Sequence, residues 1–522
     1  MIKSEKQKLL LIFCAVFTVG LLQLFLVFTI SGDGPYYINV AKSFYAGDFK
    51  AGLAKEQHPL YSLLMALAYN LTHNWVAAGQ SVSFIFGLLA VFPVYFLAKD
   101  IFGEKIGILT AVFFAFHPFL CKYSAIIRSE AVYIFLFACS VWLSWRAISR
   151  QKYSLYFLAG LTAGLNYLNR PEGLGISVVT GLYILFHNLP QFKNTYKKRL
   201  ISICLLGIGT LIFVSPYMLY IRDQSGSWQL SKKKSIITAV FGCASRSIPP
   251  ATLPSIAKIP SYSRMEEGYF RTLRGNVLTF VKVYYPTLFL LLLLSFVRRK
   301  AIPRRQEPEL FIGLIPVFYI LVFSLFYVSD RHLVPLVSVC LFWAAIGFYE
   351  LYHLILAKVS LVKTNIMSAL NNKVFAVLLI GVIITLLPYV LGPQDRDKIG
   401  QRKVGEWIKE NCGENSFILT DLDRIPFYAG GYFVPLQNRP GIDNYNDLLK
   451  FAKTPHEDGY GYEPGHSHSV DYIIIDKSRI ANYCPDFLSS VNPATLEEVH
   501  VQPKLSHSTY GEIVVYRVKY AN

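Results

Sequence analysis

Charged residues are scarce in this chain of 522 residues. Asp, Glu, Lys and Arg make up 16% of it, against about 25% in ordinary soluble domains. Apolar types make up 53% and aromatic types 15%. A chain with so little charge cannot face water on every side, so a soluble multidomain enzyme is excluded. Glycine (34) and proline (26) stand near background, which excludes collagen-like and disordered chains.

Acidic residues are the scarcer of the two charged kinds, with 33 Asp and Glu against 51 Lys and Arg and a formal net charge of +18. Such an excess of basic residues occurs in nucleic-acid-binding proteins. It also occurs in membrane proteins, because Lys and Arg accumulate in cytoplasmic loops. The positions of the charges along the chain decide between these two interpretations.

Apolar runs of about 20 residues, the length that crosses a bilayer, recur along the first three quarters of the chain. The first run follows a basic start and has no small-residue cleavage site after it, so we expect a retained helix rather than a signal peptide. The pattern predicts a polytopic α-helical membrane protein with about eleven transmembrane helices. These lie near residues 9–30, 79–98, 106–120, 129–147, 153–169, 173–189, 200–221, 278–297, 310–328, 332–355 and 374–391.

A cytoplasmic amino terminus places the basic short loops on one side, as the positive-inside rule requires. The nucleic-acid interpretation then loses its support, and no nucleic-acid partner is expected. An odd number of spans sends the carboxyl terminus outside. We therefore expect a transmembrane domain over 1–392 with external loops 31–78 and 222–277, and an external domain over 393–522. The basic residues assigned to the inside are Lys99, Lys105, Arg146, Arg150, Lys152, Lys193, Lys197, Lys198, Arg199, Arg298, Arg299, Lys300, Arg304, Arg305, Lys358, Lys363 and Lys373.

The last 130 residues read as a small α/β domain. Residues 404–411 are amphipathic, and 416–422, 472–476 and 512–518 are apolar runs typical of strands. Cys412 and Cys484 fall in this domain. An oxidising exterior would permit a bridge between them, but the sequence does not decide whether one forms.

Ionisable residues gather at the ends of spans on the predicted outer side. A charge inside the bilayer costs about 2.5–3.5 kcal/mol, so these residues need an explanation. One explanation is ordinary snorkelling and helix capping. Because four separate outer turns each carry such residues beside aromatics, we favour their convergence on one external cavity. The turns contain Asp33, then Arg128 and Glu130, then Arg170 and Glu172, and finally Asp330, Arg331 and His332.

The order of these motifs carries a family resemblance. Asp33 opens the pattern Asp-x-x-x-Tyr-x-x-x-Ala, Gly47-Asp48 follows, and Pro59-Leu60-Tyr61 begins an apolar segment too short to span, which suits a helix in the outer interface. An acidic residue then lies at the outer end of a later span. This arrangement resembles the GT-C class of integral-membrane glycosyltransferases. It is most similar to the bacterial relatives of dolichyl-phosphate-mannose protein mannosyltransferase and of the lipid A aminoarabinose transferase.

The resemblance implies an enzyme of the bacterial inner membrane. Such an enzyme moves a sugar from a polyprenyl-phosphate donor in the outer leaflet to an external lipid, glycan or protein. In the family the first-loop carboxylate is catalytic, which falls here on Asp33 as general base, and the second acidic position falls on Glu130. Relatives often have Lys-Pro-Pro where this chain has Gln57-His58-Pro59, so His58 replaces the phosphate-binding lysine.

Sugar transfer also fits the residues themselves. A carboxylate can take the proton that a hydroxyl loses in the transition state, and cations can hold the departing phosphate. Beside the carboxylates, we expect Tyr36, Tyr37, Tyr61 and Glu172 to contact substrate. No Cys or His spacing indicates a metal site, no cofactor beyond the lipid-linked donor is expected, and dependence on a divalent metal stays open. The candidates for phosphate binding are Arg331, Arg170, Arg128, His58, Lys232, Lys233 and Lys234.

Two other functions fit a polytopic chain. A transporter or flippase of a lipid-linked or anionic substrate would also need charges in the membrane. However, the sequence has no inverted repeat and almost no ionisable residue at mid-span. A noncatalytic membrane anchor for the last domain would leave the outer charges without a role.

Overall fold

The computed structural model describes residues 4–187, 196–232, 262–325, 329–359, 367–436, 442, 444–456 and 468–520. The predicted Lys233 and Lys234 therefore lie outside the described residues. The chain divides into two compact units. A helical unit is drawn from Met1–Leu24, Leu53–Cys243 and Pro260–Gly392, and a second unit contains Phe25–Gly52 and Pro393–Asn522.

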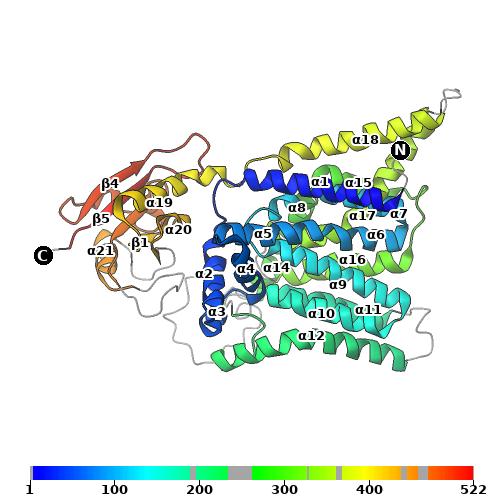
Figure 1. Ribbon diagram of the computed structural model, residues 1–522, viewed down its shortest axis with the longest axis horizontal. Coiled ribbons are helices and arrows are strands. Elements are labelled where there is room, and N and C mark those ends of the chain that lie inside the picture. Colours follow the sequence, from blue (N-terminus) through cyan, green and yellow to red (C-terminus); the bar gives the residue numbers. More distant parts are fainter. Residues whose placement is uncertain are drawn as a thin grey trace. The chain divides into compact units, whose positions relative to one another are not determined.

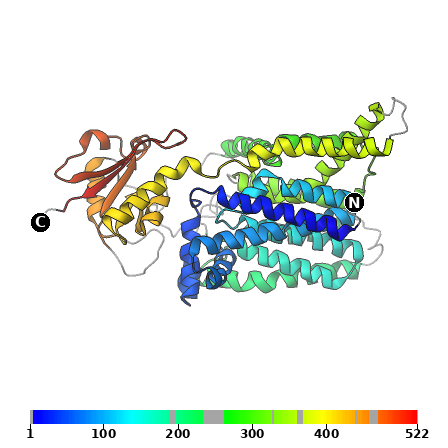
Figure 2. The ribbon, with the colours of Figure 1, turned by 45° about the horizontal axis from the view of Figure 1, so that its top comes forward.

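The helical unit is a bundle whose long helices run alongside one another in both ribbon views (Figures 1 and 2). Each predicted span coincides with a helix or with a pair of consecutive helices. The helices are α1 (Glu5–Phe25), α4 (Pro59–Thr72), α5 (Trp75–Leu89), α6 (Val91–Phe102), α7 (Glu104–Ala115), α8 (Pro118–Tyr123), α9 (Glu130–Arg150), α10 (Tyr153–Asn169), η1 (Pro171–Leu174), α11 (Gly175–Phe186), α12 (Tyr196–Ser225), α14 (Tyr262–Tyr284), α15 (Pro286–Val297), α16 (Gln306–Phe323), α17 (Asp330–Val359) and α18 (Met367–Val390).

Fewer of these helices than eleven could cross a membrane by length alone. Among the described residues, seven stretches are long and apolar enough, with α5 and α6 counted together as Trp75–Phe102, or eight if the bent pair α14 and α15 forms one span. The pair bends by 104° at Tyr285, where φ is 74° and Pro286 follows. The predicted spans at 106–120, 153–169 and 173–189 correspond to the shorter helices α7, α10 and α11. The sequence predicted correctly that these segments are apolar helices. It did not predict their lengths, because Gly and Pro residues break the helices.

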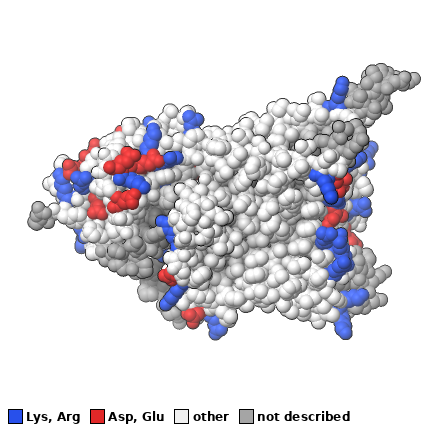
Figure 3. Space-filling model, in the orientation of Figure 1, with Lys and Arg blue, Asp and Glu red and all other residues white. Residues whose placement is uncertain are grey.

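Charged side chains of the bundle gather at helix ends. Lys8 forms an ion pair with Glu104, Lys99 with Glu5, and Arg146 with Asp100, which joins the ends of α1, α6, α7 and α9. Figure 3 shows a broad uncharged belt on the drawn face, with Lys and Arg at the end where α1 begins. Because α9 is about 30 Å long at about 1.5 Å per residue, Glu130 at its start lies far from Arg146 near its end.

The second unit contains a five-stranded sheet of order β2-β1-β3-β5-β4. Strand β1 runs parallel to both of its neighbours, β2 and the central β3, while β5 runs antiparallel to β3 and β4. The unit begins with α2 (Gly34–Tyr45), and α3 (Phe49–Ala54) ends at its boundary. The remaining elements are η4 (Arg396–Lys398), α19 (Ile399–Cys412), β1 (Phe417–Thr420), α20 (Arg424–Ala429), β2 (Tyr432–Pro435), α21 (Tyr445–Lys453), β3 (Tyr472–Asp476), η5 (Ile480–Asn482), α22 (Phe487–Ser490), β4 (Leu496–Gln502) and β5 (Ile513–Val518).

The two faces of this sheet bury separate cores. Ile418 and Ile474 point into one core with α19 and α20, whereas Leu419 and Ile473 point into the other with α21 and α22, as the alternation of side chains along a strand requires. Cys412 packs against the first core and Cys484 lies in the second. Both thiols are free, and the sheet separates them. The predicted class, a polytopic helical protein with a small α/β domain, is confirmed.

Candidate active site

Three of the four predicted outer turns come together in the helical unit. Glu130 opens α9, Arg170 and Glu172 lie at the junction of α10 and η1, and Arg331 lies in the first turn of α17. The local sequence explains each position. A glutamate in the first turn of a helix is favoured by the helix dipole. Pro171 ends α10 and keeps Arg170 extended, with φ −157° and ψ 139°.

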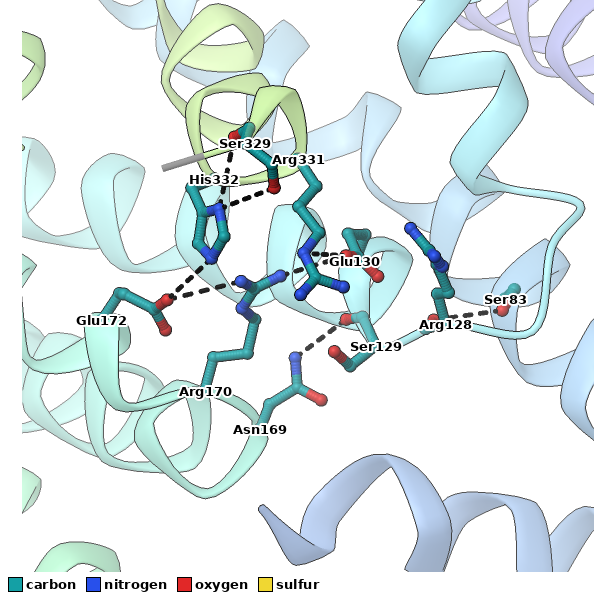
Figure 4. A network of polar contacts seen from close by, with 10 residues as sticks. All are labelled: Ser83, Arg128, Ser129, Glu130, Asn169, Arg170, Glu172, Ser329, Arg331 and His332. Atoms are coloured by element: carbon teal, nitrogen blue, oxygen red, sulfur yellow. Dashed lines mark hydrogen bonds and ion pairs between the residues drawn. The ribbon is translucent and has the colours of Figure 1, made fainter. Parts of the chain in front are cut away.

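Glu130 is the carboxylate toward which Arg170 and Arg331 both point (Figure 4). Its Oε1 lies 3.2 Å from Nη1 of Arg170 and 3.9 Å from Nε of Arg331. The Glu130 side chain is only 2% exposed and that of Arg170 is 11% exposed. Arg170 also lies over the ring of Tyr133, 5.4 Å from its centroid. The pair is therefore held in a desolvated place where charge interactions are strong.

Glu172 links the arginines to a histidine. Its Oε1 lies 3.3 Å from Nη2 of Arg170 and 3.7 Å from Nε2 of His332. The other nitrogen of His332 lies 3.2 Å from both oxygens of Ser329, and the Tyr319 hydroxyl donates to the backbone carbonyl of Glu172 at 2.7 Å. The His332 ring and the Glu172 backbone are thus each held by a further contact.

Two buried oxygens in this region have no hydrogen-bond partner within the described part of the chain. They are Oε2 of Glu172 and Oδ1 of Asn169. The amide nitrogen of Asn169 donates to the Ser129 carbonyl at 2.9 Å, which fixes the direction of its oxygen. Buried acceptors normally have partners. These two can accept hydrogen bonds from the hydroxyl groups of a ligand.

The site carries more positive than negative groups. Three guanidinium groups (Arg128, Arg170, Arg331) accompany two carboxylates (Glu130, Glu172), and the Arg128 carbonyl is held by the Ser83 hydroxyl at 3.4 Å. Asp330, the nearest acid in sequence to Arg331, instead pairs with Lys282 at 2.6 Å. Guanidinium groups beside a low-dielectric wall attract anions strongly. The arrangement therefore suits a phosphate.

The other predicted cations of the helical unit lie in an aromatic cluster. The buried His58 ring meets the rings of Tyr167 and Tyr217 edge-on, each at 5.2 Å between centroids. Nζ of Lys232 donates to the Leu53 carbonyl and lies 4.5 Å from the ring centroid of Tyr220. Partial burial lowers the pKa of the Lys232 ammonium to about 8. Lys232 therefore loses its charge more readily than an ordinary lysine.

The remaining predicted residues are placed separately. Tyr61 is fully buried, and its hydroxyl contacts the Gly79 carbonyl at 3.0 Å and Ser83 Oγ at 2.9 Å, which fits a packing role between α4 and α5. Asp33, Tyr36 and Tyr37 belong to the second unit, at the start of α2, and are half-buried.

Some residues of the site were missed by sequence reasoning. Asn169, Tyr133 and Tyr319 were not assigned roles, although Asn169 directly precedes Arg170. His332 was noted only as a neighbour of Arg331. Their contacts join α9, α10, α16 and α17, which no local pattern predicts. Within the described ranges, no group of three or more His, Cys, Asp or Glu residues is arranged to hold a metal ion.

The fold is similar to that of solved membrane transferases of the GT-C class, so the predicted resemblance is confirmed at the level of the fold. Residues 56–220 match the family described as dolichyl-phosphate-mannose-protein mannosyltransferase. No curated protein sequence matches the chain.

Solved structures with this fold include two kinds of transferase. ArnT from Cupriavidus metallidurans bound to undecaprenyl phosphate has a TM-score of 0.60 at 11% identity, over 98% of both chains. The apo state of the same protein has a TM-score of 0.60 at 13% identity, over 99% of both chains. The apo oligosaccharyltransferase from Archaeoglobus fulgidus has 0.52 at 14% identity, over 96% of this chain and 74% of that one. At such identities the likeness shows the fold alone.

Proposed function

We propose that the protein is a glycosyltransferase that moves a sugar from a polyprenyl-phosphate donor to an external lipid, glycan or protein. The observation that carries this proposal is the network of Arg170 and Arg331 with Glu130 and Glu172, in which Glu130 is almost fully buried between the two guanidinium groups. Two similar transferases add support, because one of them is bound to undecaprenyl phosphate. We place the protein in the bacterial inner membrane, with residues 393–522 outside.

The reaction assigns a role to each group. Asp33 takes the proton of the acceptor hydroxyl as its oxygen forms the new bond to the anomeric carbon. The bond between that carbon and the phosphate oxygen breaks, and polyprenyl phosphate leaves with the electron pair. Arg331 and Arg170 hold the phosphate and stabilise the charge that develops on it. Glu130 holds the two guanidinium groups in place.

In this proposal, two hydrogen-bond acceptors of the protein bind the donor sugar. Oε2 of Glu172 and Oδ1 of Asn169, which lack partners among the described residues, receive hydroxyl groups of the donor sugar. A site built to bind hydroxyls rejects analogues that lack them, because its buried acceptors would stay unpaired. We therefore expect discrimination among sugars that differ in one hydroxyl.

The test uses the purified full-length protein. It is incubated with radiolabelled polyprenyl-phosphate sugars and membrane lipid extract, and the labelled products are separated and identified. Transfer of label that is lost in Asp33→Asn, with the variant still folded, supports the proposal. Movement of intact donor across a vesicle membrane without transfer would contradict it and favour a flippase.

A further inference from the structure

The segment that leads into Asp33 is bound to the C-terminal part of the second unit. Val27 pairs with Gln394 in a parallel bridge. The backbone nitrogen of Phe28 donates to the Gln394 carbonyl at 3.3 Å, and that of Gln394 donates to the Leu26 carbonyl at 2.8 Å. Two stretches more than 360 residues apart in the sequence therefore lie side by side like strands.

Helix α20 then holds both backbone groups of Ile30. The Ile30 nitrogen donates to the Tyr428 hydroxyl at 2.7 Å, and the Ile30 carbonyl accepts from Nε of Arg424, also at 2.7 Å. The Arg424 side chain is only 8% exposed. With both polar groups of one residue fixed by two side chains of one helix, the backbone has little freedom at this point.

Asp33 follows Ile30 in a tight turn. The Gly34 nitrogen donates to the Ser31 carbonyl at 2.9 Å, and the Tyr37 nitrogen donates to the Asp33 carbonyl at 3.2 Å. Little adjustable backbone therefore lies between the residue held by α20 and the start of α2. A displacement of Ile30 is passed on to Asp33.

The backbone also passes close to the residue before Arg424. A β-carbon added at Gly32 would lie 3.0 Å from Oδ2 of Asp423 and 3.6 Å from Nη2 of Arg424, and Nη1 of Arg424 lies 3.4 Å from Oδ1 of Asp423. Partial burial raises the pKa of the Asp423 carboxyl. Arg424 opposes this rise, and the negative charge of Asp33 adds to it.

We propose that Tyr428 and Arg424 are positioning residues that hold Asp33 for catalysis, which makes the C-terminal domain a part of the catalytic apparatus. This inference rests on the proposed function, in which Asp33 is the general base. A base must lie within hydrogen-bond reach of the proton it takes. A misplacement of 1 Å costs about 100-fold in rate. A domain that served only as an anchor would have no such effect on turnover.

The test compares two tyrosine hydroxyls of the same unit. Tyr428→Phe removes the acceptor of the Ile30 amide. Tyr445→Phe is the matched control, because the Tyr445 hydroxyl also makes internal contacts, to Thr495 Oγ1 at 2.8 Å and to the Asn492 nitrogen at 3.2 Å, but it touches no residue of the 26–33 segment in the described contacts. Both variants are measured for kcat, donor KM, thermal midpoint and amide exchange over residues 26–33.

We expect Tyr428→Phe to lower kcat by about tenfold or more, with donor KM within twofold and a thermal midpoint like that of Tyr445→Phe. Amide exchange at Ile30 should rise only in Tyr428→Phe. Among variants at position 424, Arg424→Lys should retain more kcat than Arg424→Gln, because lysine can still donate to the Ile30 carbonyl.

Two failures are distinguishable. If the wild-type protein transfers sugar but Tyr428→Phe turns over like Tyr445→Phe, the positioning role is overturned and the proposed function stands. If the wild-type protein transfers no sugar from any polyprenyl-phosphate donor, the proposed function fails, and this inference fails with it.

Discussion

Glu130 is the single residue whose change should affect the site most. It is almost fully buried and faces two guanidinium groups, so its neutralisation leaves buried positive charge uncompensated. We expect Glu130→Gln to lower sugar transfer by about 100-fold. Asp100→Asn is the control, because Asp100 pairs with Arg146 in a more exposed ion pair at the other end of α9. Equal activities of the two variants in the transfer assay would remove Glu130 from the mechanism.

Arg331 should govern the affinity for the donor. Nε of Arg331 lies 3.9 Å from Oε1 of Glu130, whereas the neighbouring Asp330 pairs with Lys282. We expect Arg331→Ala to raise the donor KM about 10- to 100-fold, since hydrogen bonds to charged groups contribute about 1.5–3 kcal/mol. Arg331→Lys should recover only part of this loss, because the planar fork is missing.

Titration of the donor against both Arg331 variants, at saturating acceptor, checks this prediction. The acceptor KM should stay within twofold. An unchanged donor KM in Arg331→Ala would assign the phosphate to Arg170, Arg128 or Lys232 instead.

Asp423 should set the pH dependence of transfer. Partial burial raises its pKa, Arg424 and Lys398 lower it, and the charge of Asp33 raises it. Repulsion between two carboxylates is mutual and delays the loss of their protons to higher pH. Transfer requires an ionised base, so activity falls as the pH drops. Asp423→Asn removes this repulsion, so the acid limb of the pH–rate profile should move to lower pH. A limb that stays in place or moves to higher pH would contradict this prediction.

At the scale of elements, the contact between α10 and α12 depends on glycines. A β-carbon at Gly160 would lie 2.1 Å from the Leu206 carbonyl oxygen, and one at Gly209 would lie 2.3 Å from the Phe157 carbonyl oxygen. A carbon atom cannot come so close to a carbonyl oxygen, so a side chain at either position would force the two helices apart. Small residues that let backbones approach are typical of helix contacts in membranes.

Gly160→Ala should therefore lower the thermal midpoint of the detergent-solubilised protein by several degrees, because overpacking costs about 1–3 kcal/mol. Gly207→Ala on α12 is the matched control, since a β-carbon there would meet nothing within 4 Å. We expect that variant to be as stable as the wild type. Equal midpoints for the two variants would contradict the close packing.

Elements could be predicted from the sequence where a local pattern specifies them. The apolar runs marked the bundle helices, the run 472–476 matched β3, and the segment after His58 formed α4. Four charged turns were predicted to converge. Those of α9, α10 and α17 do, whereas the turn of Asp33 belongs to the second unit. The attachment of residues 25–52 to the C-terminal part was not foreseen. The Ile30 amide donates a hydrogen bond to the Tyr428 hydroxyl, and the Ile30 carbonyl accepts one from Arg424. The sequence of a strand-like segment does not reveal which side chains its backbone groups will bind.

At the scale of the whole molecule, the charged groups of the helical bundle lie in two separate clusters, one at each end of α9. The ion pairs of Lys8, Lys99 and Arg146 lie at one end of the bundle, and the network around Glu130 lies at the start of α9, at its opposite end. The first group fits the cytoplasmic side by the positive-inside rule. We therefore expect this end of the bundle to face the cytoplasm. The number of spans does not decide the orientation, because α7, α10 and α11 are short.

Reporter fusions test this orientation. We expect alkaline phosphatase, which is active only outside the cytoplasm, to be inactive when fused after Lys152 and active when fused after Asn522. A third fusion after Arg170 examines α10, whose 17 residues extend about 25 Å at about 1.5 Å per residue, close to the thickness of the hydrocarbon core, about 30 Å. Activity there would show that α10 crosses the membrane and that Arg170 and Glu172 lie on the outer side. An active fusion after Lys152 would reverse the orientation, and the network at the other end of α9 would then face the cytoplasm, where an externally oriented lipid-linked donor could not reach it.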